Sequence, residues 1–271
     1  MINRDSVHVW RVRLEAMALL PAAERAELVG IWRTLLSVEE LRRADAFRAE
    51  AHRQDYIVAH AALRFVLGSY LGILPAMVSI CASDGTKPVL TVAQREGDGS
   101  EFNREPAARV DLRFNMSHTS GAVLIGIAKG RELGVDIEWQ RPLDDLEGMA
   151  RTVMSSEEFL LWSRLEPTGQ MAAFHRVWTR KESYLKAIGL GLYRSLQDVT
   201  VPVSADGLED AMKDCRVVQD LSGQGSWTVL DVSAWPDYAA SVCWEGADWP
   251  LLTVRDLDIT QQDLAAMGDL D

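Results

Sequence analysis

Residues 112–138 read LRFNMSHTSGAVLIGIAKGRELGVDIE, in which apolar runs alternate with short polar turns. Such runs, bounded by turn residues, predict three consecutive β-strands with tight connections, at 112–116, 122–128 and 134–138. Side chains alternate across a strand, so in the last of the three Asp136 and Glu138 share one face. Val135 and Ile137 then point to the opposite face and into a core.

Helical and strand patterns continue on both sides of this stretch. Before it we expect a strand at 7–14, helices at 21–36 and 51–71, a short helix opened by a Ser37/Glu40 capping box, and a hairpin of strands 78–82 and 89–92. After it we expect helices at 145–153, 157–165 and 170–188, strands at 198–203, 216–221, 227–231 and 238–244, and a tail helix at 260–267.

The order of strand, helices and strands occurs once before about residue 140 and again after it. This order predicts an α+β fold of two similar α/β lobes, residues 1–139 and 140–271. Clefts between domains are common ligand sites, so the active site is expected in the cleft between the lobes.

The composition excludes several classes of protein. A net charge of −12 over 271 residues argues against a general nucleic-acid binder, which needs an excess of Lys and Arg facing phosphates. No apolar run approaches the roughly 18 residues of a membrane span. We therefore expect a cytoplasmic protein that binds neither nucleic acid nor membrane.

The paired carboxylates of Asp136 and Glu138 are the first candidates for chemistry. A bare Asp-x-Glu is most often an exposed strand face ending at solvent. Here the flanking residues are apolar, so unpaired carboxylates would be costly, and a hard cation such as Mg²⁺ would neutralise them.

A second group of polar residues lies in the stretch 178–186, WTRKESYLK. Helical geometry places Trp178, Glu182 and Lys186 on one face. Glu182 and Lys186 could form an ordinary surface salt bridge. The apolar neighbours of this pair indicate a packed helix, however, and a charged pair on a packed helix is a better functional candidate.

A third candidate is Ser117-His118, at the predicted end of a strand before the turn Thr119-Ser120-Gly121. Adjacent side chains in a strand point apart, so the pair cannot act as nucleophile and base. A lone histidine is usually structural, yet His118 and the free backbone donors of the turn could meet a phosphate. The arginines of residues 42–64 alternate with acidic residues, and a solvated helix surface explains them at least as well as phosphate binding.

With these residues in view, the chain resembles the 4′-phosphopantetheinyl transferases, in particular the large pseudo-dimeric, surfactin-synthetase-activating kind. Four elements carry the resemblance, in the family's order and within about residues 37–192. They are Gly85-Thr86-Lys87-Pro88, Phe114-Asn115-Met116-Ser117-His118, Gly134-Val135-Asp136-Ile137-Glu138 and the stretch 178–186. The resemblance implies two similar lobes in a pseudo-twofold arrangement with coenzyme A between them.

The resemblance also implies roles for single residues. Asp136, Glu138 and Glu182 look like the Mg²⁺ ligands, and Glu182 also looks like the general base. Lys181, Lys186 and His118 look like contacts to the pyrophosphate and the 3′-phosphate, with Ser117 and Lys87 beside the nucleotide and Arg43 as a further 3′-phosphate contact. Glu40 departs from the pattern, because some relatives carry lysine there.

The function that the resemblance implies is transfer of the 4′-phosphopantetheine arm of coenzyme A to a serine of an apo acyl or peptidyl carrier protein, by a monomer that uses Mg²⁺, with Mn²⁺ as a substitute. Two alternatives use the same residues. One is a metal-dependent nucleotide hydrolase or phosphotransferase, and the other is a non-catalytic module that binds a carrier protein.

Overall fold

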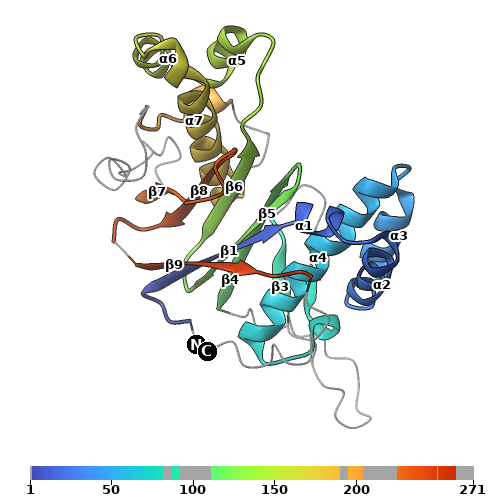
Figure 1. Ribbon diagram of the computed structural model, residues 1–271. Helices are drawn as coiled ribbons and strands as arrows, with labels where there is room; N and C mark the ends of the chain where they lie inside the picture. The colour runs from blue at the N-terminus through green and yellow to red at the C-terminus, as the bar shows by residue number, and fades with distance from the viewer. Residues whose placement is uncertain are drawn as a thin grey trace.

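The computed structural model describes residues 2–81, 87–91, 111–189, 195–203, 225–248 and 250–260, which form a mixed α+β fold (Figure 1). The helices are α1 (Glu15–Ala18), α2 (Ala22–Arg33), α3 (Val38–Ala46), α4 (Glu50–Leu71), α5 (Leu146–Val153), α6 (Ser156–Trp162) and α7 (Pro167–Ile188), with 3₁₀ turns η1 (Pro75–Met77) and η3 (Leu196–Asp198). The strands are β1 (Ser6–Arg13), β2 (Ser79–Cys81), β3 (Val89–Thr91), β4 (Leu112–Thr119), β5 (Ala122–Lys129), β6 (Leu133–Trp139), β7 (Trp227–Asp231), β8 (Tyr238–Glu245) and β9 (Leu251–Leu257).

The strands form two larger sheets and one small hairpin. The first sheet has the order β4-β5-β1-β9, in which β1 is antiparallel to β5 and parallel to β9. The second sheet has the order β6-β8-β7 and is antiparallel throughout. The expected hairpin is confirmed by the antiparallel pairing of β2 with β3.

Three hydrophobic clusters divide the described part of the molecule into four layers. The alternation along β5 shows how: Val123 and Ile125 pack into a cluster shared with α2 and α4, whereas Leu124 packs against the second sheet. A third cluster lies between the second sheet and helices α5, α6 and α7. The layers are therefore helices, sheet, sheet and helices.

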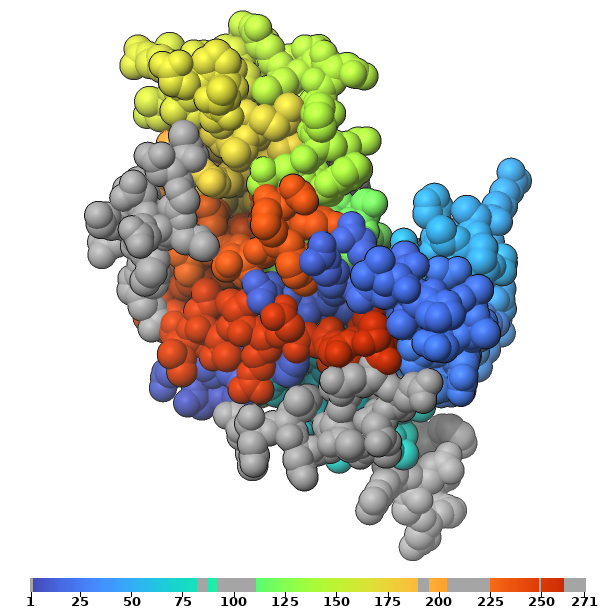
Figure 2. Space-filling model, in the orientation of Figure 1, coloured from blue at the N-terminus to red at the C-terminus, as the bar shows by residue number. Residues whose placement is uncertain are grey.

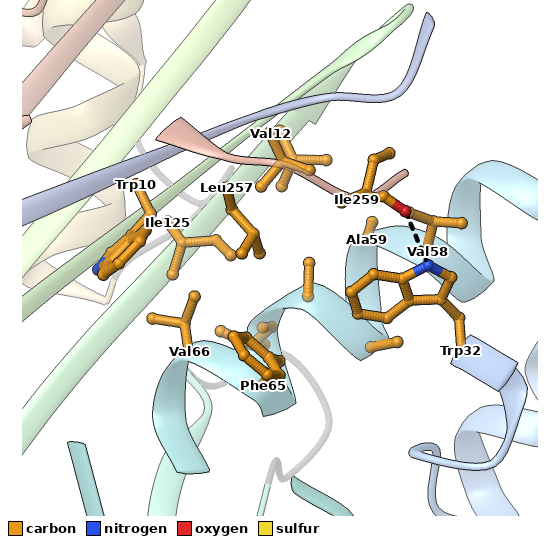
Figure 3. Close-up of a cluster of buried hydrophobic side chains, with 14 of the residues drawn as sticks. Trp10, Val12, Trp32, Val58, Ala59, Phe65, Val66, Ile125, Leu257 and Ile259 are labelled. Atoms are coloured by element: carbon orange, nitrogen blue, oxygen red, sulfur yellow. Dashed lines mark hydrogen bonds between the residues drawn. The ribbon is translucent and has the colours of Figure 1, made fainter. Parts of the chain in front are cut away.

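The cluster beneath α4 also holds the last described residues of the chain. The indole nitrogen of Trp32 donates a hydrogen bond to the carbonyl of Ile259 at 3.2 Å, and Leu257 belongs to the same cluster (Figure 3). The C-terminal strand β9 is thus part of the core around the N-terminal helices. In Figure 2, α2 to α4 (blue) and α5 to α7 (green to yellow) project from the strand region in different directions.

The two sheets meet where β4 lies beside β6, and side chains of β4 join them. The side-chain oxygen of Asn115 accepts a hydrogen bond from the backbone nitrogen of Val135 at 2.9 Å. Two residues further along β4, the Ser117 hydroxyl donates to Asp136, the residue after Val135, at 2.8 Å. We call this set of contacts the β4–β6 seam.

Helix α7 packs directly on the face of β6 opposite the inner core. A Cβ built on Gly134 would come within 2.1 Å of the carbonyl oxygen of Ser183 and 2.4 Å of the backbone nitrogen of Ala187. Only glycine lets the two backbones approach so closely. The site residues of β6 and α7 owe their proximity to this contact.

Most of the expected elements are confirmed, and the main differences concern strands. The strand expected at 112–116 continues to Thr119, because β4 pairs with β5 as far as the turn. The strand expected at 198–203 is wrong: the chain forms η3 and then no regular structure to residue 203. Strand β9 was not expected. The elements expected at 216–221 and, apart from Thr260, at 260–267 lie outside the described residues.

The sheets do not follow the expected boundary between residues 139 and 140. Strand β6 belongs to the sheet of β7 and β8, and β9 returns to the sheet of β1. Each half of the chain thus supplies a strand to the sheet of the other half. No helix among the described residues is both long and apolar enough to cross a membrane.

The close contact between β6 and α7 can be tested by Gly134→Ala. The added methyl group would collide with the α7 backbone, so we expect a loss of about 1–3 kcal/mol in the free energy of unfolding, measured by urea denaturation. The matched control is Gly30→Ala, an exposed helical position with nothing within 4 Å, which should be neutral or stabilise by up to about 1 kcal/mol. Equal stability of Gly134→Ala and wild type would contradict the contact.

Candidate functional site

The carboxylate of Asp136 forms the centre of the site and is only 2% exposed. Its Oδ1 accepts hydrogen bonds from the ammonium of Lys186 at 2.6 Å and from the hydroxyl of Ser117 at 2.8 Å. The same ammonium donates to the Ser117 hydroxyl at 2.9 Å. Residues from α7, β4 and β6 therefore converge on one buried negative charge. Strand alternation and helical periodicity predicted the faces on which Asp136 and Lys186 lie, but not that the two residues meet.

Glu138 and Glu182 extend this acidic cluster. Burial, together with the neighbouring Asp136 charge, raises the pKa of Glu138 to about 7. Burial and the same Asp136 charge also raise the pKa of Glu182. The Lys186 ammonium has the opposite effect and lowers the pKa of both carboxyls. One lysine thus faces three acidic side chains in a region of low polarity.

The donor set fits a hard divalent cation. Asp136 Oδ2 is buried, and no described residue donates a hydrogen bond to it. Carboxylate oxygens are the ligands that Mg²⁺ prefers. A cation here would oppose both causes of the raised pKa values of Glu138 and Glu182, which are burial and then the Asp136 charge. As folded, however, the described residues contain no group of three or more His, Cys, Asp or Glu side chains gathered tightly enough to hold a metal. The Asp136 charge acts on both other carboxyls, so the three carboxylates are near one another.

Ser117 and His118 point to opposite faces of β4, as expected for adjacent strand residues. Ser117 is buried in the β4–β6 seam, while His118 is exposed on the side of α4. Partial desolvation, then the charges of His60 and Lys186, lower the pKa of His118, and Asp55 opposes them. Because its pKa is lowered, the His118 imidazole is neutral at pH 7. The charges that act on it come from Lys186 of α7 and from residues of α4.

Asn115 and Thr119 are site residues that the sequence analysis left without a role. Thr119 lies two residues beyond Ser117, where its hydroxyl is 3.4 Å from Glu138 Oε2 and accepts from the Trp139 backbone nitrogen at 3.4 Å. With Asn115 it completes a polar row along one face of β4. The period-two pattern Asn-x-Ser-x-Thr at 115–119 was the signal that could have identified this row.

Arg43 lines a pocket of about 270 Å³ between α3, α4 and β4. Its side chain is largely exposed and lies 3.5 Å from Glu39. Glu40 forms another part of the wall, and its carboxylate accepts a hydrogen bond from Arg64 Nε at 2.6 Å. Burial alone would raise the pKa of Glu40, but hydrogen bonds from His60 and Ser37 lower it to about 2. Glu40, where some relatives carry lysine, is therefore ionised, and its contact with Arg64 holds α3 against α4.

Lys87 lies away from the acidic cluster. Its ammonium donates to Glu132 Oε2 at 2.7 Å and to the backbone carbonyls of Leu133 at 2.7 Å and Ala187 at 3.1 Å. It lines a second pocket of about 500 Å³, which shares Pro88 and Phe114 with the pocket of Arg43. The structure does not bring Lys87 to Asp136.

Lys181 contradicts the expectation of a phosphate contact. Its side chain is completely buried, and its ammonium donates to the carboxylate of Glu158 and to the carbonyls of Val153 and Leu196. Successive residues of a helix are about 100° apart, so Lys181 cannot share the face of its neighbour Glu182. The correction is that Lys181 joins α7 to α6 and is shielded from any ligand.

Comparisons with known proteins identify the family of this chain. A model of the 4′-phosphopantetheinyl transferase superfamily matches residues 132–243, which include β6 and α7. The chain is 30% identical over 245 residues to the 4′-phosphopantetheinyl transferase HetI of Nostoc sp. strain PCC 7120, an alignment that covers 90% of each protein. The chain therefore belongs to the 4′-phosphopantetheinyl transferase superfamily.

Two further relatives come from Bacillus. Identity to the 4′-phosphopantetheinyl transferase of Bacillus subtilis is 23% over 214 residues, or 76% of this chain and 86% of the relative. Identity to the 4′-phosphopantetheinyl transferase psf-1 of Bacillus pumilus is 27% over 213 residues, or 76% and 81%. The resemblance inferred from the four sequence elements is confirmed.

Because Lys181 is buried, we expect its substitution to lower the stability of the fold and not to weaken ligand binding directly. Lys181→Met would leave the Glu158 carboxylate buried without its cation, so we expect a loss of about 3–5 kcal/mol in the free energy of unfolding. Arg42→Gln, which breaks the exposed pair with Glu39, is the control and should cost less than about 1 kcal/mol. A Lys181→Met variant that is as stable as wild type but binds coenzyme A more weakly would support the expected contact between Lys181 and a phosphate.

The raised pKa of Glu138 predicts how stability depends on pH when no divalent metal is present. The folded protein holds this proton up to about pH 7, while the unfolded chain releases it near the ordinary pKa of a glutamate, 4.5. Wild-type stability should therefore fall relative to Glu138→Gln as pH rises through this window, by about 1–3 kcal/mol in all. Urea denaturation in a chelator from pH 4.5 to 8 measures the difference, with the exposed Glu27→Gln as control. A difference independent of pH would show that Glu138 is not perturbed.

Proposed function

We propose that the protein transfers the 4′-phosphopantetheine arm of coenzyme A to a serine of an apo acyl or peptidyl carrier protein and releases adenosine 3′,5′-bisphosphate. The observation that carries the proposal is the buried Asp136 carboxylate held by Ser117 and Lys186, within a chain that belongs to this superfamily. Glu138 and Glu182, whose pKa values depend on Asp136, complete the reactive group.

The three carboxylates are the proposed ligands of one Mg²⁺ ion, which Mn²⁺ could replace. Support comes from the unpartnered Oδ2 of Asp136 and from the excess of negative charge around it. When bound, the ion would withdraw charge from the pyrophosphate of coenzyme A and stabilise the leaving group. Lys186 would then exchange its contact with Asp136 for a phosphate oxygen, since it lies 2.6 Å from the carboxylate and is 29% exposed.

Glu182 is the proposed general base. Its raised pKa favours uptake of a proton, and α7 carries it on the face that also presents Lys186. As the serine oxygen forms its bond to the β-phosphorus, Glu182 accepts the serine proton. The phosphoanhydride bond breaks and adenosine 3′,5′-bisphosphate leaves with its electron pair, while Lys186 offsets the charge on the phosphoryl oxygens. No side chain of this protein needs to act as a nucleophile.

Coenzyme A is proposed to bind with its nucleotide toward α4. His118 faces that side from β4, and Arg43 lines the pocket of about 270 Å³ between α3, α4 and β4. The site would then lie between two lobes related by a pseudo-twofold axis. In favour of that arrangement, α4 and α7 are both 22 residues long, and each ends at a glycine with positive φ, Gly72 and Gly189.

The proposed partner is a carrier protein or carrier domain, and the proposed working form is a cytoplasmic monomer. Carrier proteins are usually acidic, and this chain has a net charge of −12. Their contact surface on this protein should therefore be apolar or locally basic. Trp139, which directly follows Glu138 and is 43% exposed, offers apolar area beside the reactive group.

The test is to incubate the protein with coenzyme A, Mg²⁺ and a panel of apo fatty-acid, polyketide and peptide carriers. We expect the mass of at least one carrier to increase by one phosphopantetheine. Asp136→Asn and Glu182→Gln should each reduce this transfer by about 100-fold or more, because both remove a carboxylate from the reactive group. Circular dichroism should show that both variants remain folded.

Other outcomes would support the alternatives. Breakdown of coenzyme A without a carrier would indicate a hydrolase, and Mg²⁺-independent carrier binding without transfer would indicate a binding module. Full activity of Asp136→Asn would contradict the proposed metal site.

A further inference from the structure

The ammonium of Lys87 lies where the beginning of β6 meets the end of α7. Leu133, whose carbonyl it contacts at 2.7 Å, is the first residue of β6. Ala187, whose carbonyl it contacts at 3.1 Å, is the penultimate residue of α7. The third contact, Glu132, immediately precedes β6 and is held from its other side by Arg113 Nε of β4 at 2.7 Å. One ammonium therefore connects three elements of the site.

The contact with α7 is of the kind that stabilises a helix end. The last carbonyls of a helix have no partner within it, and a cation placed there also complements the helix dipole. Gly189, in the left-handed conformation, caps the carbonyls of Leu185 and Lys186. Lys87 supplies a donor to the carbonyl of Ala187, which comes next. The end of α7 is thus completed by a residue from the other half of the chain.

These contacts are close to the reactive residues along the backbone. Leu133 precedes Asp136 by three residues, and Ala187 directly follows Lys186. Between them the two backbones touch at Gly134, where no side chain fits. Any slip of α7 along β6 at this point would move Lys186 relative to Asp136, which are 2.6 Å apart.

We propose that Lys87 is a positioning residue that clamps α7 onto β6 and so maintains the register of Lys186 and Glu182 against Asp136. The inference rests on the proposed transfer reaction at this site. A lysine ammonium has three N–H donors, and the three acceptors described above use all of them. Lys87 is 13% exposed. No donor remains for a nucleotide, in contrast to the role that the family resemblance implies.

The main test compares Lys87→Met with a matched control. Methionine retains the apolar stem and leaves Glu132 paired with Arg113, so the substitution removes chiefly the two carbonyl contacts. We expect kcat for carrier modification to fall roughly 10- to 100-fold and the Kd for coenzyme A to change by less than about threefold. Hydrogen exchange should accelerate in peptides covering residues 133–139 and 181–189.

The control is Arg131→Met. Arg131 is 14% exposed, pairs with Asp248 at 2.8 Å and donates to the carbonyl of Arg4, but these contacts do not reach α7. Its kcat should stay within about twofold of wild type. A Lys87→Met variant with unchanged kcat and a Kd raised tenfold or more would overturn the inference in favour of a nucleotide contact. An inactive wild type would instead refute the proposed function.

A second measurement needs no variant and so does not depend on the folding of Lys87→Met. Lysines of the wild-type protein are acetylated in competition, with and without coenzyme A, and their rates are read by mass spectrometry. Lys87 should react slowly in both states relative to the exposed Lys129. If Lys87 is labelled rapidly in the free protein and coenzyme A suppresses the labelling, the inference that Lys87 clamps α7 onto β6 is wrong.

Discussion

The site depends on the burial of one carboxylate, that of Asp136. Removing a charge from water is expensive unless hydrogen bonds and an opposite charge replace the lost hydration. Ser117 and Lys186 provide that replacement, each from a different element, and they reach only one of the two carboxylate oxygens. The arrangement is therefore both a structural junction of β4, β6 and α7 and an incompletely satisfied anionic site, which is what a cation-dependent reaction needs.

The β4–β6 seam explains how two sheets can support one site. Backbone pairing between β4 and β6 would have merged the sheets. Instead, their edges are joined by hydrogen bonds in which the Asn115 and Thr119 side chains accept and the Ser117 hydroxyl donates. Because these side chains alternate, the opposite face of β4 remains free to present His118 toward α4. The same strand thereby serves the carboxylates on one side and the pocket of Arg43 on the other.

Lys87, Lys181 and Lys186 were all expected to contact coenzyme A, but the structure places them in three different environments. Lys186 is partly exposed and contacts Asp136, so it can exchange partners. Lys181 is enclosed with Glu158, where breaking the pair would leave a buried charge. Lys87 donates to two backbone carbonyls and Glu132 at the junction of β6 and α7. Of the three, Lys186 is therefore the lysine that we propose contacts the phosphates, because it is the most exposed and its present acceptors are side chains of the site.

The sequence by itself determined the features that arise from local periodicity. Alternation along residues 134–138 placed Asp136 and Glu138 on one face, and helical spacing placed Glu182 with Lys186. The Ser37/Glu40 capping box also formed as predicted. The same helical periodicity argues against Lys181 as a partner of Glu182, so its expected role came from family resemblance alone.

Only the tertiary structure decided which distant groups meet. The pairing of β9 with β1, the exchange of strands between the two halves, and the acceptors of Lys87 and Lys181 all join residues far apart in the sequence. Local patterns specify the face on which a side chain lies, but not the element that packs against that face. That choice depends on the packing of whole sheets and helices, and here on the absence of a side chain at Gly134, which lets α7 approach β6.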